Sequence, residues 1–84
     1  MIKVKTPAVQ LTFPEWFKIM RGRSGLSQAA IAQKIGVKPQ TVSNWERGES
    51  IPSLDPDQTL KLCVLLDTDL QTFAKAFRGE IDRD

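Results

Sequence analysis

The chain has 84 residues, 40% of them apolar and 26% charged, and this ordinary globular composition excludes both a second domain and a disordered chain. It has no His, and its single cysteine, Cys63, lacks a disulfide partner, a zinc co-ligand or a catalytic base, so we expect no metal, no cofactor and no enzyme activity. The first ten residues do not resemble a signal peptide, and no stretch approaches the roughly 20 apolar residues that span a bilayer. We therefore expect a soluble cytoplasmic protein.

The formal net charge of +2 conceals a strong asymmetry along the chain. Residues 1–48 carry eight Lys and Arg against only Glu15 and Glu46, a net charge of +6, whereas residues 49–84 carry four Lys and Arg against eight Asp and Glu, a net charge of −4. The first part of the chain should therefore attract a polyanion, and the second part should repel it.

Residues 1–10 form a separate stretch, in which Ile2 and Val4 alternate with Lys3 and Lys5 until Pro7. Three interpretations remain open for this N-terminal arm: a flexible tail, a strand that forms a dimer, and an arm that follows a groove of a nucleic acid.

The first predicted helix begins after Thr12, which forms a capping box with Glu15. One face of this helix is apolar at helical spacing (Phe13, Trp16, Phe17 and Met20), and the pattern ends at Gly22 to Gly25. A second helix follows the capping residue Ser27 and ends at Gly36 in a left-handed turn. A third helix begins at Pro39, preceded by Lys38, whose side chain cannot accept a capping bond.

The fourth predicted helix begins at Asp55, with Gln58 completing a second capping box. Its residues 60–66 are apolar nearly all round, so we expect it to be the central, most buried element. Thr68 and Gln71 predict a cap for a fifth helix, which ends near Gly79 and turns four residues inward: Leu70, Phe73, Ala74 and Phe77. No segment alternates long enough for a sheet. The sequence thus predicts an all-α domain over residues 11–79 and an acidic, solvated tail over residues 80–84.

The aromatic side chains Trp16, Trp45, Phe73 and Phe77 are expected in the core, because their helical spacing is typical of packing rather than of a stacking platform. For Trp45 we expect one exposed indole edge, since it lies close to the end of its helix. Cys63 is expected to be packed and inert.

Four residues indicate how the second and third helices cross. Two helices joined by a tight turn need a small residue at their closest approach, a residue that tolerates positive φ in the turn, and apolar anchors on the second helix. Ala32, Gly36, Val42 and Trp45 stand at these places. Together with Leu26-Ser27-Gln28, Thr41-Val42-Ser43, Trp45-Glu46-Arg47-Gly48 and Pro52-Ser53, they resemble the phage repressor and Cro family of Xre-type helix-turn-helix proteins over about residues 13–77.

The resemblance implies a compact five-helix lambda-repressor-like domain whose second and third helices form the helix-turn-helix. It also implies the roles of individual residues. Base contacts would come from Pro39, Gln40, Thr41 and Asn44, phosphate contacts from Gln28, Lys38, Ser43 and Arg47, and a structural ion pair from Arg21 and Glu46. Many relatives have a polar base-reading side chain where this sequence has Pro39.

The function implied is a sequence-specific transcriptional regulator that reads the major groove of double-stranded DNA with the third helix. We expect a homodimer, formed in solution or only on DNA, and a near-palindromic site. The alternative is a protein-interaction module, such as an antitoxin or adaptor, with the same fold and a protein partner. Activator, repressor and antitoxin roles are not distinguished.

Overall fold

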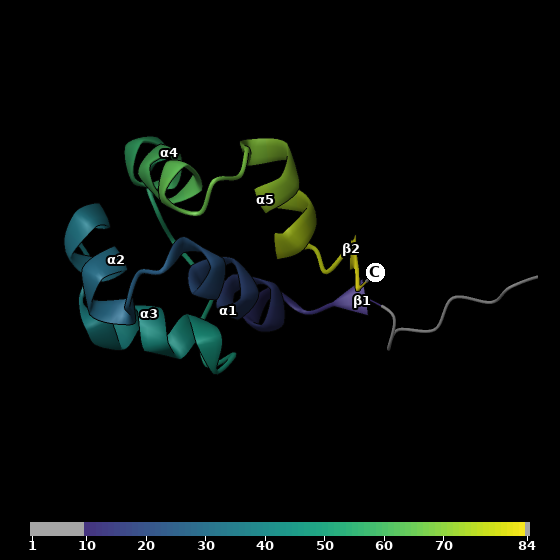
Figure 1. Ribbon diagram of the computed structural model, residues 1–84, viewed down its shortest axis with the longest axis horizontal. Coiled ribbons are helices and arrows are strands. Elements are labelled where there is room, and N and C mark those ends of the chain that lie inside the picture. Colours follow the sequence, from purple (N-terminus) through teal and green to yellow (C-terminus); the bar gives the residue numbers. More distant parts are fainter. Residues whose placement is uncertain (1–9, 84) are drawn as a thin grey trace, which may run out of the picture.

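The computed structural model describes residues 10–83, so the predicted N-terminal arm lies outside the described residues except for Gln10. These residues form five helices and two short strands, which follow one another in sequence (Figure 1): β1 Gln10–Leu11, α1 Phe13–Ser24, α2 Gln28–Ile35, α3 Pro39–Glu46, α4 Pro56–Leu65, α5 Leu70–Phe77 and β2 Ile81–Asp82. The expected five-helix architecture is confirmed. None of the described helices is long and apolar enough to span a membrane.

The ends of the first four helices follow the predicted capping chemistry. Thr12 and Asp55 each accept a backbone N–H from the residue three positions on and complete their capping boxes, and Ser27 accepts from the Ala30 N–H. Gly36 ends α2 at φ 79°, a backbone conformation that costs glycine little. Lys38 makes no side-chain capping bond, as its chemistry predicts.

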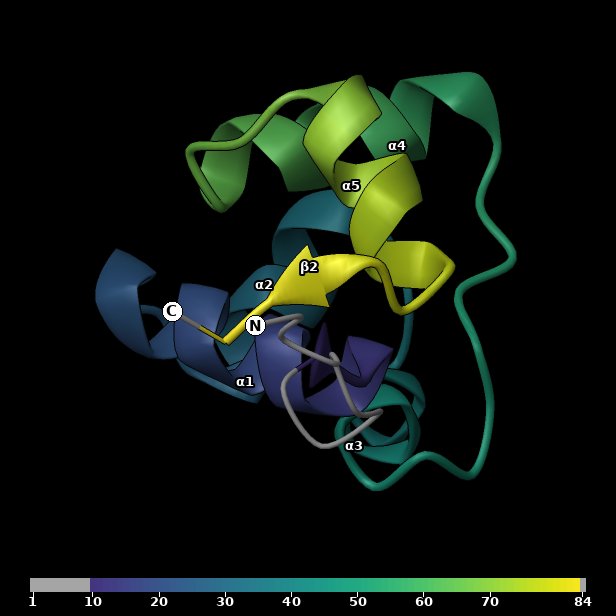
Figure 2. The same cartoon turned by 90° about the vertical axis from the view of Figure 1, so that its right-hand side faces the viewer.

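Helix α4 is not the central, most buried element, so that expectation is wrong. Only one stripe faces inward, with Leu62, Cys63 and Leu66 buried, whereas Leu60 and Val64 are exposed. The reason is the position of the helix: α4 lies at the outside of the bundle in both views (Figures 1 and 2), so its outer face meets no other helix of the described chain.

The predicted cap of α5 is also wrong. Asp69, not Thr68, is the capping residue, and its carboxylate accepts the Thr72 N–H at 2.7 Å. The N–H of Thr68 instead donates to the Cys63 carbonyl and so completes the end of α4. On α5, Phe73 and Ala76 are buried while Leu70 and Phe77 are exposed, which corrects the expected inward face.

A short antiparallel sheet joins the two ends of the described chain, although the sequence shows no alternation that predicts a sheet. Gln10 pairs with Asp82 and Leu11 with Ile81, in strands β1 and β2 (Figure 1). Arg83 then forms an ion pair with Glu15 at 2.9 Å. The predicted boundaries at residues 10–11 and 79–80 therefore separate residues that this sheet brings together, and the segment 80–83 is more than a solvated tail.

All five helices contribute to the core, and its aromatic side chains lie where α1 meets α3 and α5. Phe13 makes edge-on contacts with Phe73 and Phe77, with ring centroids 5.8 and 5.5 Å apart. Trp45 is only 1% exposed and lies edge-on to Phe17 at 5.7 Å, so the expected exposed indole edge is wrong, because α1 covers this part of α3. Cys63 is buried as expected, and burial raises the pKa of its thiol.

Candidate functional site

The crossing of α2 and α3 is built from the residues that the sequence singles out. Ala32 is fully buried at the contact, and its carbonyl accepts the N–H groups of both Gly36 and Val37 at 2.9 Å. This pair of bonds closes α2 and turns the chain into α3, which packs across α2 (Figure 1). Because Val42 and Trp45 are buried beneath α3, the opposite face of that helix points away from the core.

The outward face of α3 carries four of the eight residues proposed for base and phosphate contacts. At about 100° per residue, Gln40, Ser43, Asn44 and Arg47 fall on one side of the helix, opposite Val42 and Trp45. Thr41 lies at the edge between the two faces and is half-buried. Lys38 and Pro39 are exposed at the N-terminal end of the helix.

A hydrogen-bond network links three of these side chains. The Oδ1 atom of Asn44 accepts the Nε2–H of Gln40 at 2.9 Å and the Nη2–H of Arg47 at 2.7 Å. Arg47 also forms an ion pair with Glu49, with Nε and Oε2 3.3 Å apart. This network was not expected from the sequence, although side chains at i, i+4 and i+7 lie on one helix face and can form hydrogen bonds with one another.

The network decides which polar groups of α3 remain available to a ligand. Asn44 uses its carbonyl oxygen twice within the protein, so it presents mainly its Nδ2 donor. Gln40 uses one N–H and keeps both a second N–H and its Oε1 acceptor. Gln40 therefore retains the donor and the acceptor that a bidentate contact requires. Asn44 offers only its Nδ2 donor as long as its Oδ1 accepts from Gln40 and Arg47.

Glu46 is the buried centre of a second set of contacts that joins three helices. It is 4% exposed, and its carboxylate receives the Nε and Nη2 groups of Arg21 from α1, the latter at 3.1 Å. Arg21 also donates to the Leu26 carbonyl at 3.2 Å, and its hydrogen bonds to Glu46 raise the pKa of the guanidinium. The ion pair that the resemblance implies is thus present and ties α1 to the end of α3.

Gln28 belongs to the same set of contacts. Its Nε2 donates to Oε1 of Glu46 at 3.1 Å, which fixes the carboxamide at the first residue of α2. This bond uses one of the two N–H groups of the amide. The structure therefore places Gln28 against Glu46, a contact that was not expected from the sequence.

No group of His, Cys, Asp and Glu within residues 10–83 is arranged to hold a metal ion.

Comparisons with known proteins agree with this geometry. Residues 17–56 match a family model described as helix-turn-helix. Among solved structures, the chain is similar to the P22 c2 repressor protein, determined in complex with synthetic operator 9T in the presence of Tl+. The two are 26% identical with a TM-score of 0.65, and the match covers 79% of this chain and 97% of that chain. A comparison with curated protein sequences finds no match.

The fold and the α2–α3 crossing define a helix-turn-helix protein. Over residues 17–56 the chain is similar to the helix-turn-helix family model, and its fold is similar to that of the P22 c2 repressor protein.

Proposed function

We propose that this protein is a sequence-specific regulator that binds double-stranded DNA and inserts α3 into the major groove. The observation that carries the proposal is the outward face of α3, where Gln40, Asn44 and Arg47 form a polar network above the fixed α2–α3 crossing. The similarity to a repressor solved with its operator, over nearly the whole of that chain, supports the same use of the fold.

Gln40 is the main reader in this proposal. Its free Oε1 and remaining N–H match the N6–H and N7 groups that adenine presents in the major groove, while its other N–H stays on Asn44. Asn44, with its carbonyl occupied, donates to an acceptor on a neighbouring base. The Thr41 methyl and the ring of Pro39 provide apolar contacts, for example with a thymine methyl.

Backbone phosphates are contacted by a second group of residues, which set the register of the protein on the duplex but do not read bases. Lys38 at the start of α3 and Arg47 at its end supply the positive charges, and Ser43 and Gln28 supply neutral donors. The N-terminal end of α2, where Gln28 is the first residue, adds free backbone N–H groups and the partial positive charge of the helix dipole. For Arg47 we propose a second role as well, because its bond to Asn44 orients a reading side chain.

The functional unit in this proposal is a two-fold dimer. A single recognition helix contacts too few base pairs to specify one site in a genome, so two copies read a near-palindrome with half-sites about 10 base pairs apart. The excess of positive charge in residues 1–48 favours approach to DNA through the half of the chain that contains α3. Such a regulator acts in the cytoplasm, in association with the nucleoid.

Substitution of the two groups of residues tests this assignment. Gln40→Ala should cost about 1–3 kcal/mol on the preferred site and flatten the preference at one base position, because it removes a base contact. Lys38→Ala should weaken binding to every sequence and reduce the salt slope by about one unit, because it removes a charged phosphate contact. Gln28→Ala should also act on every sequence, but it should leave the salt slope unchanged, because its neutral amide releases no counterion.

The measurement is the affinity of each variant for a selected site and for a scrambled duplex at several salt concentrations. Equal weakening of both duplexes by Gln40→Ala would show that the reading face is misassigned. Negligible affinity of the unmodified protein for any duplex, even at low salt, would favour the protein-interaction module instead.

A further inference from the structure

Glu49 extends the polar network of α3 beyond the end of the helix. Gly48 adopts φ 71°, a left-handed conformation that turns the chain back after α3. The backbone N–H of Glu49 then donates to the Asn44 carbonyl at 2.9 Å, so the main chain fixes residue 49 beside the last turn of the helix. The carboxylate of Glu49 lies 3.3 Å from Nε of Arg47. The backbone therefore holds Glu49 where its charge acts on Arg47.

Arg47 connects this carboxylate to a candidate base-reading side chain. Its Nη2 donates to Oδ1 of Asn44 at 2.7 Å, while its Nε faces Glu49. A guanidinium holds its five N–H groups in a planar fork, so one side chain can bond two acceptors in fixed directions. The position of Glu49 thus sets the direction from which Arg47 approaches Asn44.

The orientation of the Asn44 amide decides which base edges it can contact. An asparagine presents either its carbonyl oxygen or its NH2 group, depending on how the amide is turned. Here Oδ1 accepts from both Gln40 and Arg47, so the Nδ2 donor lies on the other side of the amide. In the major groove such a donor matches the acceptors of guanine and the O4 atom of thymine. An amide that is free to turn also bonds adenine, through N6–H and N7.

We propose that Glu49 is a specificity-determining positioning residue, which holds Arg47 against Asn44 and so restricts Asn44 to base edges that carry acceptors. The inference rests on the proposed function, because it concerns how α3 reads bases. Without the Glu49 carboxylate, a DNA phosphate competes with Asn44 for the guanidinium, and the amide becomes free to turn. An exposed ion pair such as Arg47–Glu49 contributes little to folding, so its loss should change base preference rather than stability.

The base preference of Glu49→Ala tests this positioning role. Binding competition among duplexes measures the preference at the base pair that Asn44 contacts, which is the position where Asn44→Ala loses its preference. We expect Glu49→Ala to lower the discrimination against adenine at this position by about three- to fivefold, the range open to an exposed ion pair. A general gain in affinity from removing a negative charge cancels, because the measurement compares sequences within one variant.

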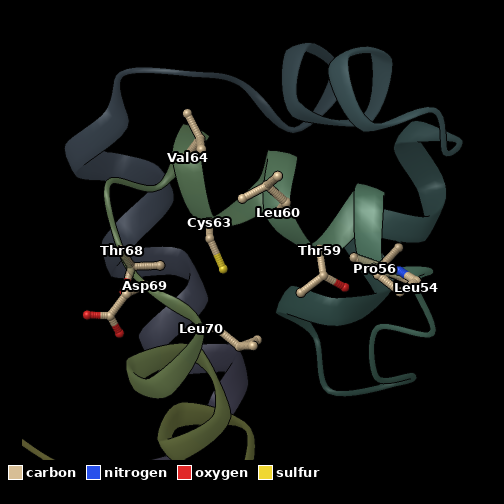
Figure 3. A pocket seen from close by; sticks show the side chains of 9 residues that line it. All are labelled: Leu54, Pro56, Thr59, Leu60, Cys63, Val64, Thr68, Asp69 and Leu70. Carbon is tan, nitrogen blue, oxygen red and sulfur yellow. The ribbon is translucent and has the colours of Figure 1, made fainter.

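Two controls separate positioning from a simple change of charge. Asp57→Ala breaks a similar exposed ion pair, with Lys61 at 3.3 Å on α4, and should leave the preference unchanged. Helix α4 lies apart from the network: with α5 it borders an apolar groove of about 590 Å³ (Figure 3), and no residue of α3 lines this groove. In an Asn44→Ala background, Glu49→Ala should not alter the preference, because the side chain through which it acts is missing.

An unchanged preference in Glu49→Ala, or the same change in the Asn44→Ala background, would overturn the proposal. Circular dichroism should show that each variant remains folded.

Nuclear magnetic resonance of the free protein provides a measurement without DNA. The side-chain NH2 group of Asn44 should be rigid on the picosecond to nanosecond timescale, and its order parameter should fall below about 0.6 in Glu49→Ala but not in Asp57→Ala. An Asn44 amide that is equally mobile with and without the Glu49 carboxylate would overturn the inference. Negligible binding of the unmodified protein to every duplex would instead overturn the proposed function, and with it the reading role of Glu49, even if the amide responds.

Discussion

Glu46 shows how much one side chain contributes to this fold. Its carboxylate is almost fully buried and holds Arg21 from α1 and Gln28 from α2 at the end of α3. A buried carboxylate is tolerated only when it is paired and fully hydrogen-bonded, and within the described residues no buried side-chain nitrogen or oxygen lacks a partner. Glu46 therefore fixes the relative positions of the helices that carry the candidate phosphate and base contacts.

Replacing Glu46 by Gln should destabilise the protein by about 3 kcal/mol, because Arg21 loses the charge that compensates it. This is the lower end of the range for a broken buried pair, since the Arg21 side chain is one-quarter exposed. Chemical denaturation measures the loss. Glu49→Gln breaks an exposed ion pair with Arg47 and should cost less than about 1 kcal/mol. Similar losses in the two variants would contradict the central role of Glu46.

Two glycines in different backbone conformations test whether the turn between α2 and α3 requires a left-handed residue. Gly36 has φ +79° in the turn between α2 and α3, whereas Gly22 lies inside α1, where an added Cβ would meet no atom within 4 Å. Gly36→Ala should destabilise the protein by about 1–2 kcal/mol through backbone strain, because the nearest atom to its Cβ, Nε2 of Gln58, is 4.0 Å away and no clash arises.

Gly22→Ala should have the opposite effect and stabilise the protein by about 0.5–1 kcal/mol, because alanine loses less backbone entropy in a helix. Thermal denaturation of both variants measures the two effects. If Gly36→Ala were neutral, the turn would not require a left-handed conformation, and the α2–α3 geometry would have to be revised.

The carboxylate of Glu15, which caps the N-terminal end of α1, should make the free energy of unfolding depend on pH. The Thr12 N–H bond and then the Arg83 side chain hold the pKa of Glu15 below its usual range, so folding favours the ionised carboxylate. This stabilisation is complete above the ordinary carboxyl pKa and is lost as the pH falls through the lowered pKa.

Glu15→Gln keeps a capping side chain but removes the charge. Urea denaturation from neutral pH down to about pH 2 should show that the unmodified protein is more stable than the variant at neutral pH and that the difference disappears in acid. A difference that stays constant over this range would show that the charge of Glu15 does not contribute.

For the whole molecule, we expect cooperative binding of the proposed two-fold dimer to depend on the spacing of the two half-sites along the DNA helix. Inserting about 5 base pairs between the half-sites turns one half-site to the opposite side of the duplex, so two copies that contact each other can no longer read both. Inserting about 10 base pairs returns both half-sites to the same side of the duplex but places them about one helical turn farther apart. We expect cooperative binding to be lost with either insertion, while the affinity for each single half-site is retained. Titration of the three duplexes by gel shift measures this.

Preferred binding of one copy to a site without a repeat would contradict the dimer on DNA.

The sequence by itself determined the features that depend on neighbouring residues. Capping boxes, a glycine in a left-handed turn and a proline at the start of a helix act over three or four positions, so they located the first four helices and the α2–α3 turn. The candidate reading face of α3 followed from the resemblance and from helical periodicity, because its inward anchors Val42 and Trp45 leave only one other face.

Other features were decided only by the tertiary structure, because they depend on which elements meet. The apolar residues of α4 could not show that one face has no partner, and the pattern in α5 could not reveal that Leu70 stays exposed. The pairing of β1 with β2 joins residues about seventy positions apart, without a local signal in either segment. The contact of Gln28 with Glu46 likewise arises only after α2 and α3 have crossed, since 18 residues separate them in the chain.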